Sequence, residues 1–348
     1  MKKYALYIII ALCLVCLAVM TSCTEPSKKQ FSAYSMDYFD TVITIAGYEN
    51  TKEEFDKVAD VALAQLGEYH RLYTIYHRFD DMENLCTVNE LKGDSHRIVK
   101  VDKRIVDMLL FAKEMYAFTE GTVNIAMGSV LSLWHDYRSV GMDNPDIAAL
   151  PPMEKLTEAA KHTDINNLVI DEQQCTVTLT DPDLKLDVGA IAKGYATEQV
   201  ARYLEEKGIS GYVLNVGGNV RTIGVKPDSS PWTVGLENPD GEDYLEYLSL
   251  SGQSVVTSGS YQRFYYVDGK PYHHIIDPDT LMPAEGYVSV SVICQDSGLG
   301  DALSTALFCM PVEKGLSLVE SVPDTEAMWL TAEGTKTVSS GWNKYVKQ

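Results

Sequence analysis

The chain has 348 residues, of which 45% are hydrophobic, so it can bury a full core and is not a mostly disordered protein. Its formal net charge of −20 argues against nucleic acid as a partner, because binding a phosphate backbone needs a basic surface. No linker, internal repeat or low-complexity tract divides the sequence. We therefore expect one catalytic domain over residues 31–348.

The N-terminus has the pattern of a bacterial lipoprotein signal. Two lysines precede an apolar run at residues 4–19, which is short for a membrane span, and small residues then lead to Cys23. We expect residues 1–22 to be a signal peptide that is removed and Cys23 to carry lipid such as palmitate. Residues 23–30 would then tether the domain to the cell membrane on its extracytoplasmic face. An uncleaved N-terminal anchor is the alternative and gives the same location.

Four cysteines remain beyond Cys23, without a CxxC pair or a histidine at zinc spacing. Cys294 and Cys309 lie in apolar runs and are expected to be buried free thiols. Cys86 and Cys175 could form a disulfide in an oxidising compartment, and their status stays open.

Helices dominate the first half of the chain and strands the second. The segment 41–48 alternates like a strand, and a helical repeat follows it, with Thr51 as the expected N-cap. The other expected helices lie at 102–117, after Gly121, and at 152–161, 190–206 and 301–310. The expected β segments are 166–180, 211–224, 232–239, 244–278 and 286–295. Because strands and helices do not alternate regularly, the pattern favours an α+β fold with a largely antiparallel sheet.

The stretch LDVGAIAKGYATEQVARYL (186–204) predicts a strand, a glycine turn and a helix beginning near Ala190. Backbone N–H groups at such a helix start suit an anion, and Lys193 would add a positive charge. The spacing is neither that of a P-loop nor that of a dinucleotide fingerprint. Alone, a strand–glycine–helix unit is commonplace and reads as structural.

Two further segments carry polar groups in unusual density. Residues 257–283 hold Ser258, Tyr261, Arg263, two adjacent histidines and Asp277. On a strand His273 and His274 would face opposite ways, so at most one can enter a given pocket. The helix expected at 301–310 begins with a carboxylate, Asp301, and places hydroxyls three and four residues later, at Ser304 and Thr305, on the same face.

Together these segments resemble the ApbE family of FAD:protein FMN transferases. The matching motifs occur in the family's order and read DVGAIAKGYA, NVGGN, WTVGLENP, TSGSYQRFY, YHHIIDP and GDALSTALF. The resemblance runs from about Tyr38 to Met310. One such motif would be weak support, whereas six in order are strong.

The resemblance implies a magnesium ion held by Asp301, Thr305 and the backbone carbonyl of Ala190. Such hard oxygen ligands, completed by substrate phosphate, suit magnesium. The family's flavin contacts fall here on Phe39, Tyr76, Thr122, Val123, Asn124, Asp187, Lys193 and the pair His274–Ile275.

Three departures from the family pattern stand out. The family usually has Met-Gly-Thr where this chain has Phe39-Asp40-Thr41, and aspartate where Asn124 stands. A turn that commonly contains glycine carries Leu281-Met282 instead. None of the three involves an expected metal ligand.

The implied reaction moves FMN from FAD to a threonine hydroxyl of an acceptor flavoprotein and releases AMP. Asp301 and His274 are the candidate catalytic residues, with His274 as general base. By resemblance, acceptors carry a Ser/Thr-Gly-Ala-Thr motif and include subunits of redox pumps. Two alternatives remain: a magnesium-dependent FAD pyrophosphatase that yields FMN and AMP, and a non-catalytic flavin-binding lipoprotein.

Overall fold

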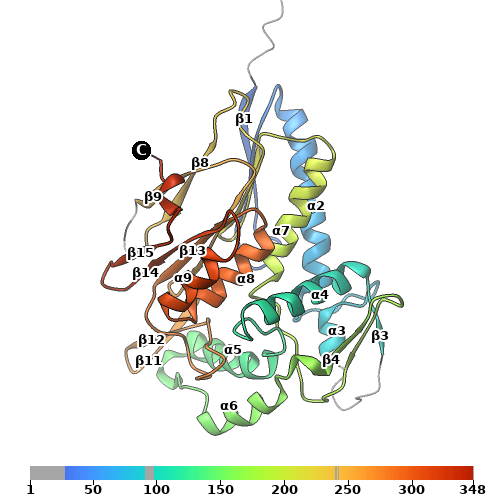
Figure 1. The fold of residues 1–348 in the computed structure, drawn as a ribbon. Helices are drawn as coiled ribbons and strands as arrows, with labels where there is room; N and C mark the ends of the chain where they lie inside the picture. Colours follow the sequence, from blue (N-terminus) through green and yellow to red (C-terminus); the bar gives the residue numbers. More distant parts are fainter. Residues whose placement is uncertain (1–27, 91–97, 240, 242, 348) are drawn as a thin grey trace, which may run out of the picture.

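The computed structural model describes residues 28–90, 98–239, 241 and 243–347 (Figure 1). The expected signal segment and Cys23 lie outside these residues. Within the described part, none of the helices is long and apolar enough for a transmembrane span. The first strand of the described residues, β1, starts at Lys29, two residues before the expected domain start.

An eight-stranded sheet forms the centre of the molecule, and all of its neighbouring strands pair antiparallel. In sheet order its strands are β1 (Lys29–Ser35), β2 (Ile43–Glu49), β6 (Tyr212–Val216), β7 (Asn219–Ile223), β10 (Ser254–Gly259), β13 (Ser289–Cys294), β14 (Glu326–Leu330) and β15 (Lys336–Val338). On β2, Ile43 and Ile45 are fully buried while Thr44 and Ala46 are half-buried, because successive side chains point to opposite faces.

Helices cover one face of this sheet (Figure 1). They are α2 (Lys52–Tyr73), α7 (Ala192–Glu206), α8 (Ser297–Phe308) and α9 (Val312–Glu320). The start of α2 follows the sequence prediction: the Thr51 hydroxyl accepts from the Glu54 N–H at 3.2 Å, and the Glu54 carboxylate accepts from the Thr51 N–H at 3.3 Å. This reciprocal pair is a capping box.

The opposite face is covered in part by a hairpin of β8 (Trp232–Glu237) and β9 (Tyr244–Leu250). A second hydrophobic cluster lies beneath it, formed by Leu236, Leu248, Leu250, Val255, Ile293, Met328 and Trp342. The hairpin therefore packs over β10, β13 and β14.

The remaining elements gather beside one end of the sheet. They are α3 (Leu85–Asn89), α4 (Lys103–Phe118), α5 (Gly128–Asp143), α6 (Met153–Ala159), the small sheet β3 (Val99–Lys100), β5 (Thr176–Leu179) and β4 (Leu168–Asp171), and the hairpin β11 (Phe264–Val267) with β12 (Lys270–His273). The α+β prediction is confirmed, as are the hairpins expected at 166–180 and 211–224.

The sequence prediction for α8 was wrong at its start. Asp296 caps the helix, which begins at Ser297, so Asp301 lies in its second turn. Gly298 and Gly300 sit inside the helix, where small residues are needed: a Cβ on Gly300 would lie 2.8 Å from Val256 Cγ2. Of the two cysteines expected to be buried, Cys294 is fully buried and Cys309 is partly buried, and both are free thiols.

The capping box yields a first prediction. Thr51→Ala should lower the free energy of unfolding by about 1 kcal/mol, because the Glu54 N–H at the start of α2 loses its side-chain acceptor. Urea denaturation measures the change. Thr51→Ser, which keeps the hydroxyl, is the control and should stay near wild type. An equal decrease in the free energy of unfolding in both variants would show that the hydroxyl of residue 51 does not stabilise the protein.

Candidate functional site

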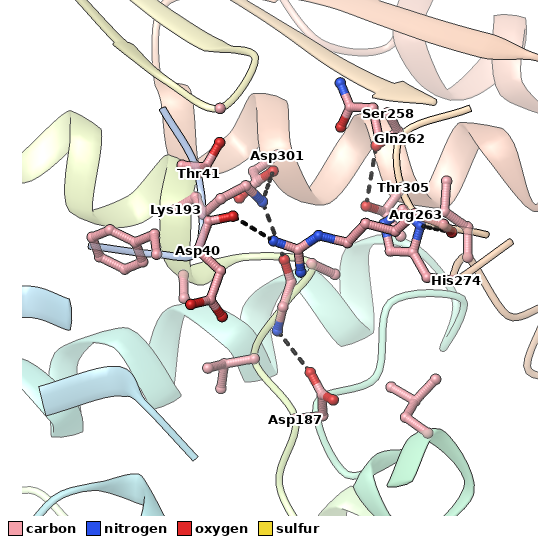
Figure 2. Close-up of a pocket in the computed structure, with 18 of the residues that line it drawn as sticks. Asp40, Thr41, Asp187, Lys193, Ser258, Gln262, Arg263, His274, Asp301 and Thr305 are labelled. Carbon is pink, nitrogen blue, oxygen red and sulfur yellow. Dashed lines mark hydrogen bonds and ion pairs between the residues drawn. The ribbon is translucent and has the colours of Figure 1, made fainter. Parts of the chain in front are cut away.

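A cavity of about 470 Å³ opens where α7 begins, α8 passes, and β10 ends (Figure 2). Its wall contains all three expected metal ligands, Ala190, Asp301 and Thr305. It also contains six of the residues expected to contact flavin or act on it, namely Phe39, Tyr76, Asp187, Lys193, His274 and Ile275. The structure thus brings together segments more than two hundred residues apart in the chain.

Asp301 is buried in this wall and is 4% exposed. Its Oδ2 accepts from the Gly194 N–H at 2.8 Å, and its Oδ1 accepts from the Asn219 amide at 3.3 Å. Lys193 Nζ lies 3.7 Å from Oδ1. Burial raises the pKa of this carboxyl, and the Lys193 charge and the hydrogen bonds from Gly194 and Asn219 oppose that rise.

Gly194 is required for this arrangement. A Cβ there would lie 2.3 Å from the Ser297 carbonyl oxygen and 2.5 Å from Asp301 Cβ. Helices α7 and α8 therefore approach at this point more closely than any side chain permits.

Thr305 lies one turn along α8 from Asp301, as the spacing predicts. The Ser258 hydroxyl lies 2.9 Å from the Ser304 hydroxyl and 3.4 Å from the Thr305 hydroxyl. Ser304 also donates to the Asp301 carbonyl at 3.1 Å. Ser304 and Ser258 thus form a hydroxyl network that positions Thr305.

These oxygens fit a hard divalent cation. Asp301 supplies a buried negative charge whose nearest cation, Lys193, stands 3.7 Å away, and Thr305 and Ala190 add neutral oxygens on the same cavity wall. Magnesium typically takes one or two carboxylates and leaves its other positions to water and substrate phosphate. No group of three or more His, Cys, Asp and Glu that could hold a metal occurs in the described residues, so a metal site rich in histidine, cysteine or several carboxylates does not fit this part of the chain.

Of the two adjacent histidines, His274 lines the cavity, while His273 bonds the Ala284 carbonyl at 2.8 Å through Nε2. The expectation that only one enters the pocket is confirmed. His274 Nδ1 lies 3.3 Å from the Arg263 carbonyl oxygen, so the neutral ring carries its proton on Nδ1 and leaves the Nε2 lone pair free. Burial, with the nearby Arg263 and Arg138 charges, lowers the pKa of His274 to about 3. A general base works best when its pKa lies near the working pH, so this value is far below the one that the predicted role of His274 requires.

The far end of the cavity is built around Asp187, well away from Asp301 (Figure 2). Asp187 Oδ1 accepts from the Gly189 N–H at 2.9 Å, which holds the turn before α7. Desolvation raises the pKa of Asp187, and the His135 and Arg138 charges partly offset this rise. Tyr76 contacts His135 with ring centroids 5.3 Å apart.

The loop between β1 and β2 closes one side of the cavity. Phe39 and Asp40 both have positive φ, 59° and 48°, a conformation that favours glycine and that aspartate tolerates better than most residues. The Phe39 N–H donates to His70 Nδ1 at 3.1 Å, and the Asp40 carbonyl accepts from Arg263 Nη2 at 3.0 Å. Leu281, the other position where the family commonly has glycine, also has a positive φ of 60°. Hydrogen bonds thus hold the β1–β2 loop in a backbone shape that glycine would adopt more easily.

Three expected flavin contacts lie outside the cavity wall. Val123 is 2% exposed and packs in the main core. The Asn124 amide donates to the Thr163 carbonyl at 2.8 Å, and its oxygen accepts from the Ala126 N–H at 2.9 Å. With Thr122, these residues lie behind Asp187, whose N–H bonds the Ile125 carbonyl at 2.8 Å. In this structure they support the site from behind and do not line it.

Sequence reasoning missed several residues of the wall. Arg138 and His135 project from α5, where a mixed polar stretch gave no signal, and Arg138 Nη2 lies 3.1 Å from His135 Nδ1. Asn219 is the last residue of the matching motif NVGGN, but the sequence analysis predicts no role for it in the site. The signal that could have identified it is an amide directly after two glycines at a strand start.

Comparisons with known proteins identify the family to which the chain belongs. The sequence matches the ApbE family over residues 39–329. The FAD:protein FMN transferase of Klebsiella pneumoniae (strain 342) is 34% identical over 281 residues, covering 78% of this chain and 84% of the relative. That of Treponema pallidum (strain Nichols) is 32% identical over 277 residues, covering 75% of this chain and 74% of the relative.

Solved structures share the fold. The crystal structure of the ApbE protein of Thermotoga maritima superposes with a TM-score of 0.79 at 27% identity, covering 92% of this chain and all of that one. The flavin transferase ApbE of Vibrio cholerae superposes with a TM-score of 0.75 over 91% of this chain and 99% of that one, and at 23% identity it supports the fold alone.

The lowered pKa of His274 gives a pH prediction. As pH falls from 7 towards 4, the unfolded chain protonates this histidine near its ordinary pKa of 6.5, whereas the folded protein resists until about 3. Protons therefore favour the unfolded state in this window, and the wild type should lose more free energy of unfolding than His274→Gln. Urea denaturation at pH 7 and pH 5 measures both. His77→Gln, at an exposed histidine, is the control and should follow the wild type; equal losses in all three proteins would contradict the burial of His274.

Proposed function

The chain belongs to the ApbE family, and we propose that it transfers FMN from FAD to a threonine hydroxyl of an acceptor flavoprotein in a magnesium-dependent reaction that releases AMP. The observation that carries the proposal is the buried Asp301 carboxylate, set beside Thr305 and Ala190 in a cavity whose wall also contains Lys193, Arg138 and Arg263. Flavin transfer is also the activity named for the relatives from Klebsiella pneumoniae and Treponema pallidum.

Asp301, Thr305 and the Ala190 carbonyl are the residues that would hold magnesium. Bound there, the ion would neutralise charge on the FAD pyrophosphate and polarise its phosphorus–oxygen bonds. The Asn219 and Gly194 hydrogen bonds fix the Asp301 carboxylate before substrate arrives, so little reorganisation is needed.

The cationic side chains of the cavity bind the same pyrophosphate. Lys193 and Arg263 lie on the wall near Asp301, and Lys193 sits in the first turn of α7, where the helix end itself favours anions (Figure 2). Arg138 adds positive charge from α5. These groups attract the dinucleotide and stabilise charge that develops as AMP leaves.

In the transfer step the threonine oxygen forms a bond to the FMN-side phosphorus. The bond from that phosphorus to the bridging oxygen breaks, and AMP departs with the electron pair. The hydroxyl proton passes to Nε2 of His274, which is the free nitrogen of the neutral ring. The negative charge of bound FAD raises the pKa of this imidazole towards the range in which it acts as a base.

We place the reaction outside the cytoplasmic membrane, on a protein anchored through lipid on Cys23. The support is the sequence alone: a short apolar run followed by small residues and a cysteine. The acceptors we propose are extracytoplasmic flavoproteins with a Ser/Thr-Gly-Ala-Thr motif, redox-pump subunits among them.

The activity test incubates the protein with FAD, Mg²⁺ and a Ser-Gly-Ala-Thr peptide, followed by mass spectrometry. The peptide should gain the mass of FMN, AMP should appear in equal amount, and a Ser-Gly-Ala-Ala peptide should stay unmodified. Release of free FMN without peptide modification would instead identify a pyrophosphatase. FAD that stays intact over a long incubation would identify a flavin-binding protein without catalysis.

The role of Asp301 predicts a sharp effect of Asp301→Asn. Transfer should fall by about 100-fold or more, because the amide keeps the shape but removes the charge that holds the cation. The Mg²⁺-dependent rise in melting temperature measured with FAD should also disappear. Asp296→Asn, in the same helix, keeps an N-cap and should retain both properties. If Asp296→Asn also lost FMN transfer and the Mg²⁺-dependent rise in melting temperature, the effect would reflect the stability of α8 and not the loss of a metal ligand.

A further inference from the structure

A second cavity, of about 900 Å³, lies between the central sheet and the β8–β9 hairpin. We call it the hairpin groove. Its floor is the outward side of β2 and β6, with Thr44, Ala46, Val213 and Asn215. All four side chains are half-buried, in contrast to their fully buried neighbours on the helix side of the sheet. The hairpin packs tightly over β10, β13 and β14 but leaves the sheet open over β2 and β6.

The hairpin groove meets the flavin cavity at the metal end. Four residues line both, namely Thr41, Gly217, Thr257 and Gln262. Two of them lie close in the chain to residues of the site. Thr257 precedes Ser258, whose hydroxyl bonds the Thr305 hydroxyl. Gly217 lies two residues before Asn219, whose amide donates to Asp301. The groove therefore reaches the place where the pyrophosphate would be cut.

The passage between the two cavities is lined by Gln262 and by three small residues, Thr41, Gly217 and Thr257. Gly217 and Gly218 both have positive φ, 58° and 90°, and a Cβ on Gly217 would lie 2.3 Å from Thr41 Oγ1. A side chain there would strain the turn and fill the passage.

The wall formed by β8 presents a strand edge. All six residues of β8 line the groove, whereas one face of a strand would supply only every second residue. One edge of β8 pairs with β9, and β9 in turn bonds the C-terminal segment, with the Ser249 N–H donating to the Tyr345 carbonyl at 2.7 Å. In the described residues no strand pairs with the other edge of β8. Such an edge can accept an added extended chain.

Trp232, the first residue of β8, places an unpaired polar group beside the groove. It lines the groove, is 5% exposed, and its indole N–H has no acceptor among the described residues. A buried donor without an acceptor is unfavourable, so a polar group is expected to satisfy it when the groove is filled.

We propose that the hairpin groove binds the acceptor polypeptide as an extended segment along β8 and presents its threonine through the glycine-lined passage to the flavin cavity. This rests on the proposed function, which requires a macromolecular acceptor to reach the pyrophosphate. The proposal adds where that acceptor binds.

Blocking the groove tests the proposal. Val213→Arg places a long charged side chain on the floor, and Val169→Arg, at a strand position 48% exposed on the small sheet, is the matched control. With a folded acceptor domain carrying Ser-Gly-Ala-Thr, kcat/KM for FMN transfer should fall about tenfold or more in Val213→Arg and stay unchanged in Val169→Arg. The FAD dissociation constant, from flavin fluorescence, should stay within about twofold in both.

Three results would overturn this account in distinguishable ways. Normal transfer by Val213→Arg would refute the groove while leaving the proposed function intact. Weakened FAD binding in that variant would assign the groove to the dinucleotide instead. No transfer by the wild type would refute the proposed function and the groove with it.

A cross-linking experiment covers the case in which Val213→Arg fails to fold. The photoreactive residue p-benzoylphenylalanine replaces Tyr244, which lines the groove and is 55% exposed, or Tyr266, which is 56% exposed on β11 and outside it. Irradiation with the acceptor domain should give a cross-linked pair from position 244 and none from position 266. Equal capture at both positions, or capture of a second copy of this chain at 244, would overturn the proposal.

Discussion

The contact between the Asp301 carboxylate and the Gly194 N–H is the constraint on which the rest of the site depends. At 2.8 Å it joins α8 to α7 at a point where no side chain fits between the two helices. The same contact puts Lys193, the preceding residue, within 3.7 Å of the carboxylate and places the first turn of α7 at the cavity. The close packing of α7 against α8 therefore also fixes the positions of the Asp301 carboxylate and the Lys193 ammonium group.

A second buried carboxylate holds the two helices in this arrangement. Glu198, one turn further along α7 and 2% exposed, accepts from the Ser297 N–H at 2.9 Å and from Arg221 Nε at 3.0 Å. A buried charge is costly unless it is paired and hydrogen-bonded, and Glu198 meets both conditions. It thereby connects the start of α8, the middle of α7 and strand β7 behind the metal end of the cavity. The protein side of Asp301 is therefore held by contacts from α7 and from β7.

Local patterns predicted much of this structure, and tertiary contacts account for what they missed. The Thr51 cap and the antiparallel hairpins depend on near neighbours in the chain, so alternation and capping residues were sufficient. The start of α8 was misplaced because Gly298 and Gly300 read as a break, whereas their small size serves packing against β10 and α7. Arg138 and Glu198 gave no sequence signal, since their importance arises only when distant segments meet. The shared spacing of Asp301 and Thr305 was visible because both lie on one helix.

The central claim is that a divalent cation binds at Asp301 when the dinucleotide is present. A crystal of the protein grown with FAD and Mn²⁺, with diffraction measured for anomalous scattering, tests it most directly. We predict an anomalous peak in contact with the Asp301 carboxylate, the Thr305 hydroxyl and the Ala190 carbonyl, beside the pyrophosphate. FAD seated in the cavity with no peak at these three oxygens would contradict the account.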